Sequence, residues 1–474
     1  MTTAVQKNIR QLGEEAQQLA KDLEYVMYNG ALYAPIDYVT GDRSVVPPEE
    51  NRIWVQLNGD DLRNAALEQF NTQLTGQSQE DSFTYMVRGA ARQVNHVEPR
   101  ILIKTAAGLK ALQTDGTLSD PDGTFVPNCI EWMLNEDPDD QAEVAATILE
   151  WVGGDEEIYT SLMYHLATIL SPHWSAGRYI LLIGQGRNGK SVLMTMLKNL
   201  MGKVNVSGVD RQMIADNNVA IHDLNGKLLN LVMDGSAEFL KDSGREKSLI
   251  TGESTNIRPL YKGTLKEVQT HALFIEGLNR EPKSRDKSTA LQARLTRFIF
   301  PNEYPTNPLF YEHMNSDRML GALLALLIKY YVTKGEAYQK LAPTKSALEA
   351  QQDHMVANSL ALQFMVQVDR DEPLGVLDTL IDMEIPELTQ RFASWRIKMG
   401  DISVWSEENV KEQFDPYIKS WRGKSYRPAG SQKVAKMPTI KEYRPVVLDL
   451  FAQKPAPQEP ETQEEADVPA VVAD

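Results

Sequence analysis

The sequence predicts an α/β protein whose core is a parallel sheet flanked by helices. Three observations predict that core: short apolar runs at residues 179–183, 227–234 and 271–278, each of a length typical of a buried strand. An apolar helical pattern follows the first run, as expected of strands that alternate with helices. At 474 residues the chain has room for about two to four domains, so further elements are expected on both sides of the core.

Composition excludes several classes of protein. The hydrophobic content of 42% and the charged content of 24% are ordinary for a globular chain. The sequence has no apolar run of about 18 residues, which a membrane span requires, and residues 1–7 lack the apolar core of a signal peptide. Cys129 is the single cysteine, which excludes an intramolecular disulfide and a two-cysteine metal site. A reducing, cytoplasmic setting is therefore expected.

The net charge of −16 is unevenly distributed. Residues 455–474 carry six acidic and no basic residues, which leaves −10 for the rest of the chain. An acidic protein can still bind nucleic acid through a local basic channel, because the field in a cleft follows its lining. The composition of residues 446–474 predicts a disordered acidic tail that recruits a partner or blocks a DNA site.

Residues 1–90 predict a helix followed by a small β-rich region. Apolar residues recur in steps of four and three between residues 3 and 24, which predicts a helix with one apolar seam. That seam either packs on its own domain or mediates self-association. Asn29-Gly30 lies between two β-prone runs and predicts a hairpin, and residues 53–57 predict a further strand.

Residues 91–175 predict a helical subdomain that packs on the core. Apolar residues at helical spacing predict helices at 143–152 and 156–170, and Gly153-Gly154 marks the break between them. Pro172 closes the second helix just before the first core strand. The core itself is expected to span residues 176–310.

A glycine-rich turn follows the first core strand and opens a helix. Its sequence, Gly-Gln-Gly-Arg-Asn-Gly-Lys-Ser, matches G-x-x-x-x-G-K-[ST], in which backbone N–H groups turn inward around phosphate oxygens at a helix N-terminus. In such a loop Lys190 reaches the β- and γ-phosphates and Ser191 holds Mg²⁺. The strand and helix around the turn favour nucleotide binding over a glycine-rich hairpin without a ligand. The residues expected to cradle the phosphates are Gly184, Gly186, Gly189, Lys190 and Ser191.

The later core strands each border a polar residue that suits a nucleotide site. Asp234 ends the second strand, where a carboxylate holds Mg²⁺ through its water shell, and Glu238 is a candidate to orient the attacking water. Asn279 ends the third strand, where an amide can hydrogen-bond the γ-phosphate or the lytic water. Arg294 and Arg297 precede a fourth strand and either stabilise phosphoryl charge, often in a neighbouring subunit, or form structural ion pairs.

A basic hairpin is expected between the second and third core strands, over residues 256–266. Lysine neutralises phosphate and a tyrosine face can stack a base, so a contact with single-stranded DNA competes with a merely solvated hairpin. The candidate contacts are Arg258, Tyr261, Lys262 and Lys266.

The C-terminal third divides into two predicted parts. Residues 311–370 predict helices that form a lid on the core. Residues 371–445 predict helices, one of them running from Ser406 towards Trp421, and then a basic segment punctuated by Gly and Pro. Between residues 411 and 444 there are nine Lys or Arg against three acids, which favours a winged-helix-like DNA-binding module over a solvated basic face. The candidate contacts there are Lys424 and Arg427.

In their order, these motifs resemble those of superfamily III helicases of viruses, phages and plasmids, in particular the poxvirus-type and phage primase–helicase branch. The phosphate loop is similar to that branch's G-x-G-x-N-G-K-S, with Asn188 at its characteristic place as a nucleotide-binding residue. Residues 229–234 look like its acidic strand, with Asp where the family usually has Glu, and residues 247–253 are similar to its K-x-L-T-G-G-D. Asn279-x-x-Pro282 looks like its sensor, Arg294 stands at its arginine finger, and Lys262 lies in its DNA-translocating loop.

The resemblance covers residues 130–310 most strongly and implies a modified AAA+ core. It implies a replicative DNA helicase that uses ATP and Mg²⁺, assembles as a homo-oligomer, typically a hexamer, and translocates on single-stranded DNA. The implied partners are single-stranded and forked duplex DNA and a separate primase, polymerase or single-strand-binding protein. Its implied location is the cytoplasm of a bacterial host for a phage or plasmid. Two other functions stay open: a DNA-binding ATPase switch for origin assembly or partner recruitment, and small-molecule phosphotransfer, for which no acceptor site is visible.

Overall fold

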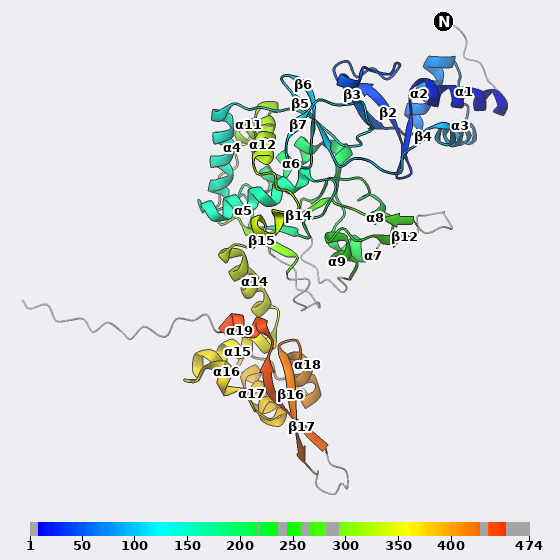
Figure 1. The fold of residues 1–474 in the computed structure, drawn as a ribbon. Helices are drawn as coiled ribbons and strands as arrows, with labels where there is room; N and C mark the ends of the chain where they lie inside the picture. Colours follow the sequence, from blue (N-terminus) through cyan, green and yellow to red (C-terminus); the bar gives the residue numbers. More distant parts are fainter. Residues whose placement is uncertain are drawn as a thin grey trace, which may run out of the picture. The chain divides into compact units, whose positions relative to one another are not determined.

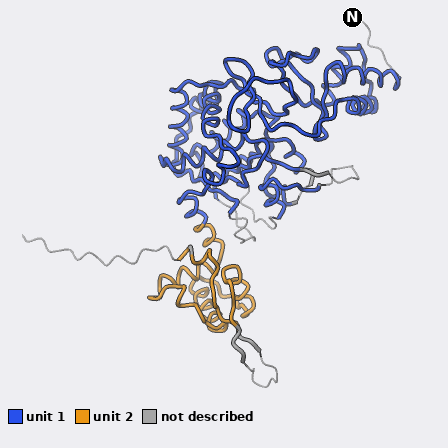
Figure 2. The backbone as a smooth tube through the Cα atoms, in the orientation of Figure 1, with its two compact units in different colours: residues 1–351 blue, residues 352–474 orange. Residues whose placement is uncertain are grey.

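The computed structural model describes residues 8–216, 218–235, 244–257, 266–280, 293–426 and 435–451. The chain divides into two compact units, residues 1–351 and 352–474, and each is described by itself (Figure 2). The second unit begins before residue 371, where its start was expected. The reason is α15 (Leu360–Asp371), whose buried residues Leu362 and Phe364 belong to the core of the second unit.

Unit 1 is built around a five-stranded parallel sheet in the order β10-β11-β14-β9-β15 (Figure 1). The strand β9 lies between β14 and β15, so the phosphate-loop strand has a neighbour on both sides. The expected core strands and the α/β fold class are confirmed. The strands are β9 (Tyr179–Ile183), β10 (Val206–Ser207), β11 (Leu229–Val232), β14 (Leu273–Leu278) and β15 (Leu295–Ile299).

Helices cover both faces of this sheet. On β14 the side chains alternate: Ile275 packs into one core and Phe274 and Leu278 into another. The first face shares its core with α4 (Pro138–Trp151), α5 (Glu156–Ala167), α6 (Lys190–Asn205) and α12 (Asp317–Lys329). The second face packs on α7 (Arg211–Asp216), α8 (Asn218–His222) and α9 (Gly244–Ile250). The helices expected at 143–152 and 156–170 are thus confirmed as α4 and α5, the latter followed by the 3₁₀ turn η2 (Thr168–Leu170).

Residues 92–133 form strands. The prediction of a helical subdomain over residues 91–175 is therefore wrong for this part of the chain. Ile101 and Ile103 face the shared core of the large sheet, whereas Leu102 faces a second cluster on the opposite side. Burial on both faces makes the apolar run continuous and hides the period of two that identifies a half-buried strand. The strands are β4 (Arg92–Gln93), β5 (Ile101–Thr105), β6 (Gly108–Leu112), β7 (Leu118–Ser119) and β8 (Cys129–Met133), the last four in the order β7-β6-β5-β8.

One core joins three regions that the sequence analysis separated. Ile130 of β8, Ile148 of α4, Leu182 of β9, Leu197 of α6 and Leu323 of α12 belong to the same cluster of buried side chains. The helix α12 therefore packs as part of this core and is not a detached lid. It is preceded by α11 (Pro308–Met314) and followed by α13 (Ala337–Lys340) and α14 (Lys345–Ala357).

A buried amide network ties the β8 region to the end of α6. The Asn128 Nδ2 donates to Asn205 Oδ1 at 2.9 Å and to the Gly226 carbonyl at 3.1 Å. In turn, the Asn205 Nδ2 donates to the Cys129 carbonyl at 2.9 Å. Since buried polar groups are costly without partners, this reciprocal bonding fixes the two regions together.

The N-terminal region forms its own small core. The helix α1 (Ile9–Asp22) buries Leu12 and Leu19 against α3 (Gln77–Ala90), so its seam packs within its own unit. Asn29 and Gly30 have φ angles of 49° and 77° and join β1 to β2, which confirms the hairpin. The remaining elements are β1 (Val26–Tyr28), β2 (Ala31–Asp37), η1 (Glu49–Asn51), β3 (Arg52–Gln56) and α2 (Gly59–Phe70).

Unit 2 combines helices with a long hairpin. The helix expected to run from Ser406 towards Trp421 ends at Phe414. Asp415 still has helical backbone angles, but Pro416 after it has no N–H group to continue the helical hydrogen bonds. An isolated bridge also pairs Glu384 with Thr439 of the hairpin. The elements are α15, α16 (Gly375–Thr379), α17 (Ile385–Lys398), α18 (Glu407–Phe414), β16 (Ile418–Tyr426), β17 (Ala435–Tyr443) and α19 (Pro445–Phe451).

Within the described ranges, no helix has both the length and the apolar character needed to cross a membrane.

Candidate nucleotide-binding site

The glycine-rich turn joins β9 to α6 at the carboxyl edge of the large sheet. Gly186 and Gly189 have φ angles of 113° and 87°, a region that side chains rarely adopt. A Cβ atom at Gly189 would also collide with the indole ring of Trp151, so this position requires glycine on two grounds. The turn aims its backbone at the N-terminus of a 16-residue helix, an arrangement that attracts phosphate.

The buried side chain of Asn188 stabilises this loop. Its side chain is 2% exposed, and its Nδ2 donates to the Phe300 carbonyl just after β15 at 3.3 Å. Gly184 leaves room for it, because a Cβ there would overlap the Asn188 amide and lie 2.7 Å from the same carbonyl oxygen. The side chain of Asn188 thus shapes the loop, and its expected contact with a nucleotide stays a prediction.

Lys190 is folded back across the loop. Its Nζ donates to the Gly184 carbonyl at 2.8 Å, and the residue is 5% exposed. Burial lowers the pKa of Lys190, and the charge of Asp234 opposes that shift. A phosphate entering the loop would replace the Gly184 carbonyl as the partner of this ammonium group.

Asp234 and Ser191 suit a magnesium ion. Asp234 lies just beyond β11 and Ser191 in the first turn of α6, and both side chains are exposed. The effect of Asp234 on the pKa of Lys190 shows that it acts on the phosphate loop. No cluster of three or more His, Cys, Asp or Glu residues able to hold a metal is found in the described part of the chain. Mg²⁺ held by these two oxygen ligands would complete its shell with phosphate and water.

A polar pocket of about 380 Å³ gathers the ends of three strands. It is lined by Gln185 from the phosphate loop, Gly235 beyond β11, and Asn279 and Arg280 beyond β14. Asn279 thus lines a pocket together with Gln185 of the loop, and its expected contact with a γ-phosphate or a water stays a prediction. Arg280 was assigned no role from the sequence, although it adjoins Asn279; at this place its charge suits a phosphate.

An aromatic pocket of about 430 Å³ borders the same loop. Ring faces and apolar side chains beside a phosphate site suit a nucleobase. The sequence analysis missed this pocket because its walls come from three separate stretches, and only the fold brings them together. Its lining includes Trp151, Gly189, Val192, Tyr304, Phe310 and Tyr311.

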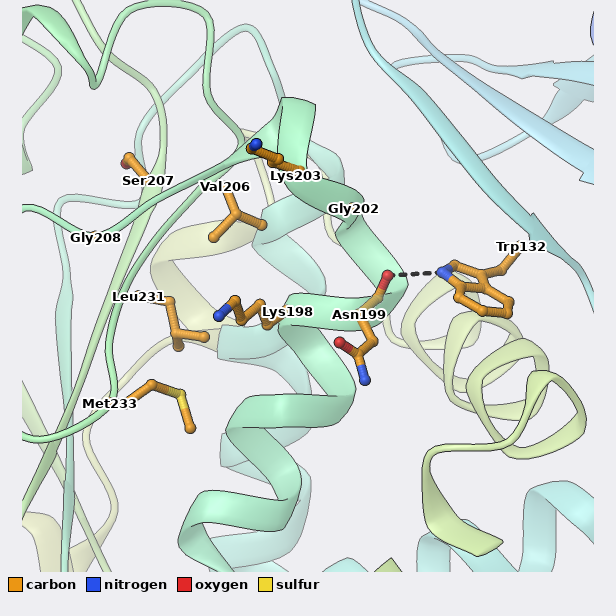
Figure 3. Close-up of a pocket in the computed structure, with 10 residues that line it drawn as sticks. All are labelled: Trp132, Lys198, Asn199, Gly202, Lys203, Val206, Ser207, Gly208, Leu231 and Met233. Carbon is orange, nitrogen blue, oxygen red and sulfur yellow. Dashed lines mark hydrogen bonds between the residues drawn. The ribbon is translucent and has the colours of Figure 1, made fainter. Parts of the chain in front are cut away.

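A third pocket, of about 550 Å³, lies farther along α6 and β10 (Figure 3). Lys198 and Lys203 are exposed at its edge. Leu231 of β11 and Met233, the first residue after β11, also line it. The indole N–H of Trp132 donates to the Asn199 carbonyl at 2.6 Å. None of the predicted site residues lines this pocket.

Two acids are buried on the α7–α9 face of the sheet, and they differ in their partners. Glu246 accepts from Arg211 Nε at 2.7 Å, and both residues are under 5% exposed. Glu276 of β14 is 2% exposed, and its Oε2 has no hydrogen-bond partner among the described residues. Burial raises the pKa of Glu276 to about 7, against the charge of Arg211. The ring of Tyr179 lies 5.6 Å from the Arg211 guanidinium carbon.

Arg294 lies at the opposite edge of the sheet. Its carbonyl accepts from the N–H of Tyr179, the first residue of β9, at 2.8 Å. The loop leaves the other end of β9, after five residues that span about 17 Å. The structure therefore does not bring Arg294 to Lys190 within one chain. Arg297 is 3% exposed in the middle of β15, inside the sheet.

The predicted DNA-binding hairpin is present as β12 (Thr255–Ile257) and β13 (Lys266–Val268), which pair in antiparallel fashion. Lys266 begins β13, and Lys424 lies in β16. The remaining predicted residues, Glu238, Arg258, Tyr261, Lys262 and Arg427, lie outside the described residues.

Comparison with known proteins gives a family model of unknown function (DUF5906) that matches residues 182–297. This range runs from β9 to β15 and contains the phosphate loop, Asp234, Asn279 and Arg294. No curated protein matches the chain.

Solved structures of one protein match along most of the chain. The apo structure of the NrS-1 C-terminal region has a TM-score of 0.51 and 13% identity, covering 92% of this chain and 99% of that one. Its A-form apo structure has a TM-score of 0.50 and 12% identity over the same shares. A match to JCV helicase has a TM-score of 0.28 and 15% identity, covers 48% of this chain and 65% of that one, and carries no argument. At such identities the likeness shows the fold: this chain is similar in fold to the NrS-1 C-terminal region.

Proposed function

We propose that this chain is an ATP-dependent DNA helicase that translocates on single-stranded DNA as a homo-oligomeric ring. The observation that carries the proposal is the polar pocket, which gathers the phosphate loop, the residue after Asp234, Asn279 and Arg280 at one sheet edge. This is the set of groups that ATP hydrolysis needs: a phosphate cradle, a metal ligand and donors for the γ-phosphate.

In the proposed site, backbone N–H groups of the loop and Lys190 bind the β- and γ-phosphates. Ser191 and Asp234 would hold Mg²⁺, which neutralises charge on the phosphate oxygens. Asn279 and Arg280 face the γ-phosphate from the end of β14. The aromatic pocket takes the adenine base, which the rings of Tyr304 and Phe310 contact.

A ring is proposed because Arg294 is remote from the loop of its own chain. An arginine that stabilises phosphoryl charge must reach the γ-phosphate, and often comes from a neighbouring subunit. A head-to-tail interface joins the carboxyl edge of one sheet to a different surface of the next subunit and closes into a ring. The resemblance to superfamily III helicases makes six the expected number of subunits.

The DNA-binding part of the proposal rests on two hairpins. The first is the β12–β13 hairpin, and Lys262, which falls between its two strands in the sequence and outside the described residues, is the residue expected to push the DNA strand. In unit 2 the hairpin strands carry exposed basic residues, whereas α18, the helix that precedes them, carries three glutamates and one lysine. Because an acidic helix is repelled by phosphates, unit 2 would bind DNA through its β16–β17 hairpin without reading bases. The exposed basic residues described there are Lys419, Arg422 and Lys441.

The proposed partners are single-stranded DNA and forked duplexes, and a separate primase, polymerase or single-strand-binding protein. The proposed setting is phage or plasmid replication in a bacterial cytoplasm. These partners follow from the resemblance of the motifs, and their test is co-purification with the replication proteins of the host or phage.

Strand displacement on a forked duplex tests the proposal. Wild type is expected to separate the strands with ATP and Mg²⁺, and Lys190→Ala is expected to lose ATP turnover and displacement, because the loop loses its phosphate ligand. Lys198→Ala is the matched control: it removes an exposed lysine from the same helix, away from the loop, and should remain active. ATP turnover that single-stranded DNA does not change would contradict the helicase.

One observation favours the alternative of a DNA-bound ATP switch that assembles an origin or recruits partners without unwinding. Gly235 follows Asp234, so the position after the metal ligand has no side chain to activate water. Under this alternative the protein would bind ATP tightly and hydrolyse it slowly. Single-turnover measurement of ADP formation separates the two functions.

A further inference from the structure

The space beside Gly235 is filled by a carboxyl group from another strand. A Cβ atom built on Gly235 would lie 2.6 Å from Cγ and Cδ of Glu276, and closer still to its Oε1. The Gly235 N–H donates to the Gly277 carbonyl at 2.8 Å, which holds the backbone after Asp234 over β14. The Glu276 carboxyl therefore stands where a side chain at position 235 would begin.

Glu276 lies near Arg211 and the Tyr179 hydroxyl, both of which lower its pKa, but Arg211 donates its hydrogen bonds to Glu246. Glu276 interrupts an apolar strand between Ile275 and Gly277, and its buried Oε2 has no hydrogen-bond partner in the described part of the chain. An unpartnered buried carboxyl destabilises a fold, and such groups are concentrated at functional sites. Glu246, buried on the same face, has the pairing with Arg211 that a structural acid requires.

The place of Glu276 relative to the polar pocket is defined by its neighbours. Gly235 and Asn279 both line that pocket, and Glu276 lies against the first and three residues before the second on the same strand. Gly235, which has no side chain, lines the pocket and lies against the Glu276 carboxyl, whereas Glu276 itself does not line the pocket.

We propose that Glu276, reaching across from β14, is the catalytic acid–base residue that orients and deprotonates the attacking water, in place of a side chain at position 235. This inference rests on the proposed ATP hydrolysis. The water oxygen bonds to the γ-phosphorus while the bond from that phosphorus to the β–γ bridging oxygen breaks, and its electron pair stays on ADP. The water proton passes to the Glu276 carboxylate and then to solvent.

The pKa of Glu276, raised to about 7 by burial, is compatible with this role, because a general base works best when its pKa is near the working pH. The position of the Glu276 carboxyl also explains why residue 235 is a glycine. Any side chain at position 235 must displace the carboxyl, so the glycine and the glutamate form one arrangement.

Glu276→Gln tests the proposal by steady-state ATP turnover with single-stranded DNA. It should lower kcat about 100-fold or more while the KM for ATP changes less than about threefold, because proton transfer is lost and the phosphate loop is intact. Glu276→Asp should recover part of the rate. The matched control is Glu246→Gln, which breaks the ion pair with Arg211 and should lower the melting temperature but leave kcat within a few-fold.

Two further variants separate Glu276 from its competitors. Gly235→Ala should lower kcat as Glu276→Gln does, because the added methyl group displaces the carboxyl without removing it. This variant also serves if Glu276→Gln does not fold. Glu238→Gln is the competing variant, since loss of turnover there with full turnover in Glu276→Gln would assign the attacking water to Glu238.

Full turnover in Glu276→Gln or in Gly235→Ala would overturn the role of Glu276. If Lys190→Ala and Glu238→Gln are inactive while Glu276→Gln is active, the proposed function stands and this inference fails. A wild-type protein that binds ATP but does not hydrolyse it would overturn both.

Discussion

The carboxyl and amino ends of the strands in the five-stranded sheet differ in which predicted site residues they bring together within one chain. At the carboxyl edge the loop after β9, Asp234 beyond β11, and Asn279 and Arg280 beyond β14 lie around one phosphate site. At the amino edge Arg294 precedes β15 and bonds through its carbonyl to the start of β9. The two edges are separated by the length of the strands.

This difference separates substitutions that should act within one subunit from one that should act across an interface. Residues at the carboxyl edge belong to the site of their own chain, and each substitution there should affect its own subunit. In the proposed ring Arg294 contributes to the site of another subunit, so its substitution should have an effect that a mixture of variants can rescue. The predictions below test this contrast between the two edges.

The largest expected effect is that of Arg294→Ala, which should lower kcat for ATP about 1,000-fold while ATP still binds. Mixing this variant with Lys190→Ala should restore activity, because a Lys190→Ala subunit offers its intact Arg294 to the intact loop of its neighbour. In a random mixture about a quarter of the interfaces would be competent. Turnover of the mixture against each variant alone is the measurement.

Arg63→Ala, which removes an arginine from α2, is the control and should remain active. A mixture no more active than its components would show that Arg294 does not act across an interface.

The second prediction concerns the pH dependence of stability at the carboxyl edge. The pKa of Glu276 is raised from 4.5 to about 7 in the folded state. The contribution of this group to the free energy of unfolding is therefore fully present below pH 4.5 and is lost as the pH rises through 7. Glu276→Gln should therefore be more stable than wild type by about 3 kcal/mol at pH 8 and nearly equal to it at pH 4.5. Urea unfolding of both proteins at several pH values measures this difference. A difference independent of pH would contradict the raised pKa.

A third prediction is that Asn279→Ala lowers kcat about 100-fold, the loss typical of one donor to a transition state. Since Asn279 belongs to the carboxyl edge, mixing this variant with Lys190→Ala should restore nothing. Turnover in the mixture above that of the variants alone would place Asn279, like Arg294, in the site of a neighbour.

The smallest expected effect is that of Phe310→Ala in the aromatic pocket, which should raise the KM for ATP about tenfold and leave kcat nearly unchanged. Its control is Leu309→Ala, an exposed neighbour that does not line the pocket. The comparison of KM for ATP and GTP shows whether this pocket reads the base.

The sequence predicts the core well because buried parallel strands are continuous apolar runs. Residues 179–183, 227–234 and 271–278 were identified in this way, and the glycine-rich turn located the phosphate loop between a strand and a helix. The strands between residues 92 and 133 were missed for the same physical reason: burial on both faces removes the alternation that distinguishes a short strand from a helix.

The site was predictable only where its residues adjoin a motif. Lys190 belongs to the glycine-rich motif and Asp234 lies just beyond a strand, whereas Trp151 and Phe310 meet beside the loop only in the folded chain. For Glu276 a signal was available, since an acid inside an apolar strand is costly and seldom without a purpose. What the sequence could not supply was its contact with Gly235, which depends on how the backbone crosses β14 after Asp234.

The shared core sets the smallest piece of the chain that can fold around the phosphate loop. The family model matches residues 182–297, yet Ile130 before that range and Leu323 after it pack in the same core, and Asn205 is bonded to Asn128. A fragment trimmed to the matched range would expose these apolar faces to water and leave buried amides unpaired. The stretch that the family model matches and the unit that folds cooperatively therefore have different limits, and exchange of this core between proteins would have to carry β5 to β8 and α12 with it.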